Sequence, residues 1–405
     1  FNGCIYNYRE LRQDLERRGY RFTSSGDTEV VLKAFHAWGQ DAWQRLHGMF
    51  AVVVHERDTG RVTLARDRFG IKPLYLAQTR GGPRFGSSLP ALICDPEVDR
   101  SIDLMALDHY LSWHAVVPPP LTLLKGVRKL PPGSSLSIDG EGEGTLHTWW
   151  QLSVQADPEL AALPVRERED MVEQALRTAV QRRALADVPV GVLLSGGVDS
   201  SLIVALLAEM GQPGLQTFSI GFDGAGGEAG DEFMYSDLVA QRFGTTHHRI
   251  HIPTDQLMDA LPGTIAAMSE PMVSYDNVGF YLLSKEVSKH IKVVQSGQGA
   301  DEVFGGYHWY PPLMNSNDVV GDYARVFLDR DHAMLKTQLA PAARGAGQDP
   351  RFRAISHRPR QRILIADDAL RPAARLRGRD PADHRVARPA GAPGPGREDP
   401  GRAGG

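Results

Sequence analysis

The chain has 405 residues, of which 42% are hydrophobic and 23% are charged, and its formal net charge is −4. This balance is typical of a globular protein and argues against a nucleic-acid partner or a polybasic membrane patch. No apolar run approaches the length of a membrane span. The two cysteines, Cys4 and Cys94, are too few for a disulfide scaffold. We therefore expect a cytoplasmic protein of about two or three domains.

The first 150 residues have the pattern of an α+β domain. Apolar spacing predicts helices over 8–18 and 28–38. Strands are predicted over 49–55 and 61–65, with Asp58-Thr59-Gly60 as the turn between them. Helices and strands thus fall in separate stretches of this region, rather than in regular alternation.

A second region, over residues 164–350, has the pattern of an α/β domain. A short apolar run predicts a strand over 190–194, and further strands are predicted over 217–222, 246–252 and 291–295. A helical pattern follows each of the first three. Strands that alternate with helices indicate a parallel sheet with both faces covered.

The composition changes toward the end of the chain. From Arg371 to Gly405 nearly every residue is Ala, Arg, Pro, Gly or Asp, which cannot bury enough apolar surface to offset chain entropy. We interpret residues 351–405 as a disordered tail or as the product of a shifted reading frame. At the other end, Phe1 is not a Met and opens a stretch with strand character, so we expect the chain to begin inside a longer protein.

A glycine-rich loop follows the predicted strand at 190–194. Residues 195–200 have the sequence Ser-Gly-Gly-Val-Asp-Ser. Glycines let the backbone approach an anion closely, and the start of the next helix offers free N–H groups. Asp199 would repel a phosphate unless a cation lies between them, which predicts Mg²⁺. A turn with a capping serine is the alternative for such a loop, but the whole string favours a site for the pyrophosphate of ATP.

A second glycine-rich loop, at 296–302, has the sequence Ser-Gly-Gln-Gly-Ala-Asp-Glu. Ligands of open parallel sheets bind beyond the carboxyl ends of the strands, so both loops are expected at one site. Asp199 and Asp301 are candidate ligands of a shared Mg²⁺, although an acidic first helical turn also explains Asp301. Ile220 is a candidate wall for the adenine base, with core packing as its alternative.

Together these segments resemble the glutamine-dependent asparagine synthetase family. Residues 195–200 match its pyrophosphate loop and residues 296–307 its second ATP loop, and residues 2–7, 25–29 and 67–75 are similar to segments of its glutaminase domain. The resemblance implies an N-terminal-nucleophile glutaminase domain with αββα layers over residues 1–150. It implies a parallel-sheet ATP-pyrophosphatase domain over residues 164–350.

The resemblance covers about residues 1–310 and implies a reaction. The family hydrolyses glutamine in the first domain, and ammonia passes through an internal tunnel to the second. There ATP activates a carboxylate as an acyl-AMP, which ammonia converts to an amide. The implied substrates are glutamine, ATP and a carboxylate acceptor, with Mg²⁺ as the metal. The oligomeric state is left open, and a homodimer is the one oligomer considered.

The resemblance also implies roles for individual residues. Asn2 and Gly3 correspond to the oxyanion hole of the glutaminase, and Asp27 to the carboxylate that holds the α-ammonium of glutamine. The implied ATP-binding residues are Leu193, Ser195, Gly196, Gly197, Asp199, Ser200, Ile220, Ser296 and Gly297. Gln298 corresponds to a position near the reacting carboxylate of the acceptor.

The sequence departs from the family at several places. The family's nucleophilic cysteine, which lies upstream of Asn2, is not in the chain. Cys4, where asparagine synthetases carry Glu, is no substitute, so we expect the chain as given not to hydrolyse glutamine. Gln298 also stands where asparagine synthetases carry Glu, and an amide cannot act as a base. After about Arg351 we find no match to the C-terminal segment of the family.

Several functions stay open at this stage. The first is glutamine-dependent asparagine synthesis. Gln298, Cys4 and Leu89-Pro90 resemble a bacterial branch that amidates N-acetylglutaminylglutamine, whose acceptor would be a dipeptide carboxylate. A β-lactam-forming relative is disfavoured because such relatives need no glutamine pocket, whereas Asn2 and Asp27 are retained. The non-enzymatic alternative is a truncated ATP-binding relic without turnover.

Overall fold

The computed structural model describes residues 1–328 and 334, apart from 154, 156, 224–231, 273, 275 and 315. The predicted tail, residues 351–405, lies outside the described residues. Below, the N-terminal half is residues 1–150 and the C-terminal half is residues 158–327. In the described part, no helix has both the length and the apolar character needed to cross a membrane.

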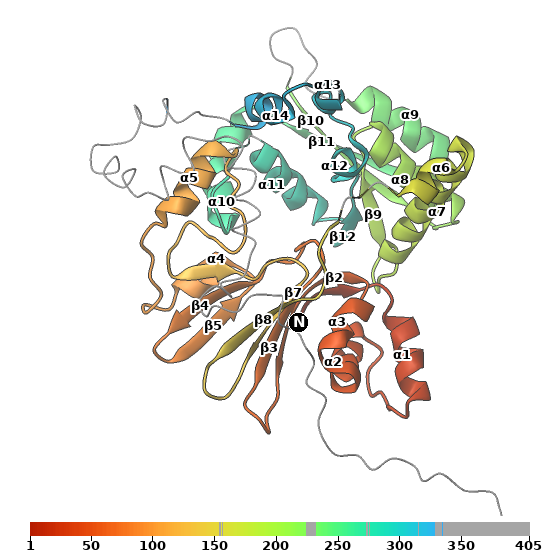
Figure 1. The fold of residues 1–405 in the computed structure, drawn as a ribbon. Helices are drawn as coiled ribbons and strands as arrows, with labels where there is room; N and C mark the ends of the chain where they lie inside the picture. The colour runs from red at the N-terminus through yellow and green to blue at the C-terminus, as the bar shows by residue number, and fades with distance from the viewer. Residues whose placement is uncertain are drawn as a thin grey trace, which may run out of the picture. The chain divides into compact units, whose positions relative to one another are not determined.

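Two antiparallel sheets form the N-terminal half (Figure 1). The five-stranded sheet has the order β1-β2-β3-β7-β8, and the three-stranded sheet has the order β5-β4-β6. The strands are β1 (Asn2–Ile5), β2 (Gly48–His55), β3 (Val62–Arg66), β4 (Tyr75–Thr79), β5 (Gly82–Gly86), β6 (Val127–Lys129), β7 (Ser134–Ile138) and β8 (Gly144–Thr148). The helices are α1 (Tyr8–Arg17), α2 (Asp27–Trp38), α3 (Ala42–Arg45), α4 (Leu89–Ile93) and α5 (Leu104–Ser112), with a 3-10 turn η1 (Gly39–Asp41).

Apolar side chains join these elements in layers. Successive residues of β2 point to opposite faces, so Phe50 packs with Leu15 of α1 on one face. Leu64 and Leu130 pack with the other face, between the two sheets. Leu92 of α4 packs against the three-stranded sheet. The resulting order of helix, sheet, sheet and helix confirms the predicted αββα fold.

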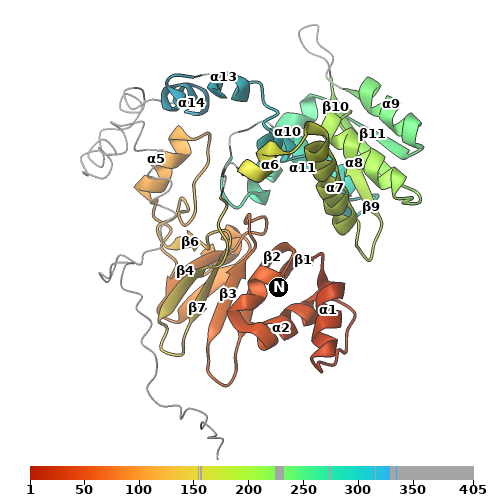
Figure 2. The ribbon, with the colours of Figure 1, turned by 45° about the vertical axis from the view of Figure 1, so that its right-hand side comes forward.

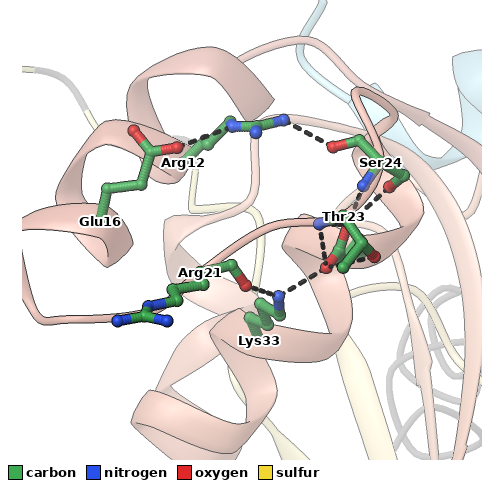
Figure 3. A network of polar contacts seen from close by, with 7 residues as sticks. Arg12, Glu16, Arg21, Thr23, Ser24 and Lys33 are labelled. Carbon is green, nitrogen blue, oxygen red and sulfur yellow. Dashed lines mark hydrogen bonds and ion pairs between the residues drawn. The ribbon is translucent and has the colours of Figure 1, made fainter.

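A polar network joins α1 to α2 through the segment that precedes α2 (Figure 3). Arg12 of α1 donates to the carbonyl oxygen of Ser24 at 2.7 Å. The backbone N–H of Ser24 donates to the Glu29 carboxylate at 2.7 Å, and Lys33 donates to the same carboxylate. These hydrogen bonds, that from Lys33 first, hold the pKa of Glu29 well below its usual range. The network thereby fixes the start of the helix that carries Asp27.

The C-terminal half is built on a four-stranded parallel sheet of order β11-β10-β9-β12. Its strands are β9 (Val190–Leu193), β10 (Gln216–Phe222), β11 (Thr246–Ile252) and β12 (Val293–Gln295). Its helices are α6 (Pro158–Ala162), α7 (Val165–Arg183), α8 (Val198–Glu209), α9 (Phe233–Phe243), α10 (Asp255–Ala267), α11 (Asp276–Val287), α12 (Ala300–Phe304), α13 (Tyr310–Met314) and α14 (Val319–Phe327). The predicted alternation of strands and helices is confirmed.

Helices cover both faces of the parallel sheet (Figures 1 and 2). Val192 and Leu194 pack with buried residues of α7, α8 and α9 on one face. Leu193 and Phe218 pack with Leu283 of α11 on the opposite face. Covered on both faces, the central strand β9 is apolar throughout, whereas β11 at the edge of the sheet is largely polar and partly exposed.

Candidate nucleotide site

The first glycine-rich loop joins β9 to α8 and is packed tightly from behind. Gly196 has φ 91°, a conformation that glycine adopts without strain. A Cβ atom on Gly196 would lie 2.5 Å from the Cβ of Tyr235 and 2.7 Å from the backbone nitrogen of Ser236. The start of α9 therefore leaves no room for a side chain at this position, and it fixes the path of the loop.

Hydroxyl groups hold the same loop from within. The Ser200 hydroxyl donates to the Gly197 carbonyl at 3.2 Å and lies 3.1 Å from the Ser195 hydroxyl. Gly197 is the N-cap of α8, and no described side chain caps this helix. The first N–H groups of α8 are therefore available to an anionic ligand, with the positive end of the helix dipole behind them.

The second glycine-rich loop touches the first. It follows β12, which pairs in parallel with β9, so both loops leave the same end of neighbouring strands. A Cβ atom on Gly297 would lie 3.0 Å from the Cβ of Asp199 and 3.0 Å from the backbone nitrogen of Ser200. The two predicted ATP loops are thus in van der Waals contact.

Both loops line one cavity of about 530 Å³. The predicted residues that line it are Leu193, Ser195, Gly197, Asp199, Ser200, Ile220, Ser296, Gly297, Gln298 and Asp301. Gly196 is not in the lining. Phe222, Glu232, Phe233 and Phe280 also line the cavity, and our sequence analysis did not identify them, because no motif marks them.

Two carboxylates reach the cavity from the first turns of two helices. Asp199 lies in α8 and Asp301 in α12. In the part of the chain that the structure describes, no group of three or more His, Cys, Asp or Glu could hold a metal ion. Mg²⁺ is commonly bound by one or two carboxylates together with substrate phosphates and water. This donor set therefore fits Mg²⁺ that arrives with a nucleotide.

The residues predicted for glutamine hydrolysis lie at the start of β1 and of α2. The Asn2 side-chain amide donates to the Ser87 hydroxyl at 2.9 Å. The backbone N–H of Ile5 donates to one carboxylate oxygen of Asp27 at 2.9 Å, which ties the end of β1 to α2. Gly3 and Asp27 line a common cavity, whereas Asn2 is not in its lining.

Cys4 is half-buried beside these residues. Burial, followed by the nearby Asp27 charge, raises the pKa of the Cys4 thiol. A raised pKa keeps the sulfur protonated at neutral pH, and the thiolate is the nucleophilic form. The environment of Cys4 thus agrees with the expectation that it does not act as a nucleophile.

The cavity that Gly3, Cys4 and Asp27 line has a volume of about 970 Å³. Gly297 and Gln298 of the second ATP loop also line it. All of these residues belong to one compact unit. Residues predicted for the two half-reactions therefore border a common cavity.

Two family models match the chain. The model of the asparagine synthase family matches residues 171–390, and that of the glutamine amidotransferase domain matches residues 1–150. The fold and the site thus define a chain in which an amidotransferase domain precedes an asparagine synthase domain. The chain belongs to the asparagine synthase family. The family match extends past residue 351, where we expected the resemblance to stop.

Similar curated proteins are asparagine synthetases. Glutamine-hydrolysing asparagine synthetase 1 of Bacillus subtilis (strain 168) is 37% identical over 314 residues, which are 76% of this chain and 48% of that protein. Glutamine-hydrolysing asparagine synthetase B of Escherichia coli (strain K12) is 29% identical over 348 residues, which are 81% of this chain and 55% of that protein. The chain spans about half the length of the curated relatives it matches.

Proposed function

We propose that the protein is an ATP-dependent and glutamine-dependent amide-forming ligase of the asparagine synthase type. The observation that carries this proposal is the contact between the two glycine-rich loops, where Gly297 lies against Asp199 and Ser200 beside one cavity. An adenylating centre must hold the pyrophosphate that leaves and the AMP that stays. Two adjoining loops, one of them at an uncapped helix start, meet that requirement.

The proposed reaction has two steps. A carboxylate oxygen of the acceptor attacks the α-phosphorus of ATP. The bond from this phosphorus to the bridging oxygen breaks, and pyrophosphate leaves with the electron pair. Ammonia then attacks the carbonyl carbon of the acyl-AMP, AMP leaves with the electrons of the carbon–oxygen bond, and the nitrogen loses a proton to give the amide.

The chain's own residues supply binding and charge for the first step. Leu193 and Ile220 would contact the adenosine, and Ser296 and Gly297 the AMP phosphate. The uncapped start of α8 would bind the leaving pyrophosphate. Because donors fixed before the reaction need no reorganisation, they favour the transition state over the bound substrate.

Further roles fall on the polar residues that line the cavity. Asp199 and Asp301 would hold Mg²⁺, which neutralises phosphate charge when it is bound. Gln298 would orient the acceptor carboxylate, since its amide both donates and accepts hydrogen bonds but removes no proton.

Glutamine is the proposed source of nitrogen. Asn2 and Gly3 would donate to the carboxamide oxygen of bound glutamine, and Asp27 would bind its α-ammonium group, while no residue of the chain is assigned as the nucleophile of the hydrolysis. The match of residues 1–150 to the glutamine amidotransferase domain supports this assignment. The cavity that Gly3, Asp27 and Gln298 share supports transfer of ammonia between the two sites.

ATP–pyrophosphate exchange tests the proposal and separates its alternatives. Exchange that requires aspartate supports asparagine synthesis. Exchange that requires N-acetylglutaminylglutamine supports a dipeptide as the acceptor. Gln298 and Cys4 carry the resemblance to that branch. Binding of Mg·ATP without exchange with either acceptor supports an ATP-binding relic. Failure to bind Mg·ATP overturns the proposal.

A further inference from the structure

Gly306 lies directly against the side chain of Asp301. A Cβ atom on Gly306 would lie 2.1 Å from Oδ1 of Asp301 and 3.1 Å from its Cγ. Real Cβ atoms essentially never show the first distance, and the second is tighter than nine in ten of their contacts. The Gly306 N–H also donates to the Asp301 carbonyl at 3.0 Å. Residue 306 therefore contacts both the backbone and the carboxylate of Asp301.

The turn after α12 brings Gly306 to this place. Gly305 ends α12 with φ 67°, and this left-handed conformation folds the chain back onto Asp301. Gly306 is not among the residues with a left-handed φ, so its backbone accepts alanine. The methyl group of alanine would be accommodated by rotation of the Asp301 carboxylate, because the end of a side chain moves more easily than a hydrogen-bonded helix.

Tyr307 holds the segment on the other side of Gly306. Its hydroxyl donates to the Glu302 carboxylate at 3.0 Å, and its ring stacks on Trp309 with 4.4 Å between centroids. Gly305 and Tyr307 are thus both fixed to α12 or to its neighbours. The segment between them has little freedom to move away from Asp301.

We infer that Gly306 is a positioning residue for the Asp301 carboxylate: the missing side chain at 306 sets where this carboxylate lies in the nucleotide cavity. The inference rests on the proposed function, because the place of Asp301 matters only if the cavity binds Mg·ATP. If Gly306 had a purely structural role, its substitution would lower the stability of the fold without a specific effect on metal-dependent binding.

Gly306→Ala in the full chain separates these roles. We expect the Mg²⁺ concentration that gives half-maximal ATP binding to rise about tenfold, a typical effect of disturbing the support of a metal ligand. ATP binding without metal and the midpoint of thermal unfolding should stay unchanged. Gly140→Ala is the matched control, because a Cβ atom there meets only the Thr59 carbonyl oxygen, at 3.4 Å, and its φ is not left-handed.

A second substitution completes the test. In an Asp301→Ala background, Gly306→Ala should have no further effect on the Mg²⁺ requirement, because there is no carboxylate left to displace. The same tenfold change in both backgrounds, or no change in the single variant, would overturn the inference. If Gly306→Ala does not fold, recovery of folding in the double variant supports the contact with Asp301, and failure of both overturns it. Unchanged Mg·ATP binding in Asp301→Ala alone would overturn the proposed metal site itself.

Discussion

The charge of Asp199 has a testable consequence at the scale of single residues. This residue lies in the first turn of α8 and lines the nucleotide cavity. Asp199→Asn keeps the shape of the side chain but removes a full negative charge, so we expect the affinity for Mg·ATP to fall about 10- to 100-fold. Calorimetric titration with Mg·ATP measures this. Asp259→Asn removes the same charge from an exposed position in α10 and should have no effect. Equal affinities for the two variants would mean that the site is misidentified.

Glu29 predicts a pH dependence of stability. Its hydrogen bonds, with Lys33 first and Ser24 next, hold the pKa of this carboxyl below its unfolded value, which is about 4.3. A lowered pKa in the folded state stabilises the protein above about pH 4.3, and this stabilisation is lost as the pH falls toward the folded pKa. Glu29→Gln should therefore lower the unfolding midpoint at pH 7 and flatten its decline below about pH 4.3. Unfolding curves over a pH series measure this, with Glu141→Gln at an exposed position between β7 and β8 as the control.

At the scale of elements, two glycine-to-alanine substitutions test the contact between α9 and the first glycine-rich loop. Gly196 has φ 91° and Gly211 has φ 73°. Alanine at either site meets backbone strain of about 1–2 kcal/mol. Only at Gly196 would the new Cβ also clash with α9, whereas at Gly211 it meets nothing within 4 Å. We expect Gly196→Ala to reduce the free energy of unfolding by more than Gly211→Ala and to abolish ATP binding. Equal losses measured by denaturant unfolding would show that α9 does not constrain the loop.

Local patterns were sufficient for the elements with a strong apolar period. The strand predicted at 190–194 and the helices predicted at 8–18 and 28–38 are present to within two residues. By contrast, α10 was not predicted, and Pro262 lies inside it. The strand β7 was missed because its sequence is largely serine, and its extended form depends on pairing with β3 and β8. These elements are set by neighbours that lie far away in the sequence.

Some residues of the candidate site were likewise predicted from the sequence, and others were not. The loop residues that follow β9 and β12 were predicted to meet because the strand ends of a parallel sheet lie at one edge. Phe280 and Glu232 were missed, because their place in the cavity depends on how α11 and α9 pack. The contact of Gly306 with Asp301 depends on the left-handed turn at Gly305. The glycine pair at 305–306 signals the end of a helix, but it does not say which side chain the turn meets.

At the scale of the whole molecule, the apolar packing is divided between the halves. One group of buried clusters contains Phe50, Leu64 and Val127 in the N-terminal half. Two further clusters, with Val192 and Phe218, lie in the C-terminal half. Among the residues that the structure describes, no such cluster draws members from both halves. Each half therefore has a core of its own, and we expect two unfolding transitions.

Mg·ATP should shift only one of these transitions. A ligand that binds the folded state stabilises it by about 2.7 kcal/mol when its concentration is 100 times the Kd, and the proposed site lies in the C-terminal half. Tryptophan fluorescence reports mainly on the N-terminal half, because every tryptophan except Trp309 lies within residues 1–150. In a thermal scan with Mg·ATP, we expect the fluorescence midpoint to stay constant while a second, calorimetric transition moves to higher temperature. Hydrogen exchange should slow in β9 and β10 but not in β2 and β3. Asp199→Asn should remove both effects. If Mg·ATP shifted the fluorescence midpoint as much as the calorimetric one, the two halves would unfold as one cooperative unit, despite their separate cores.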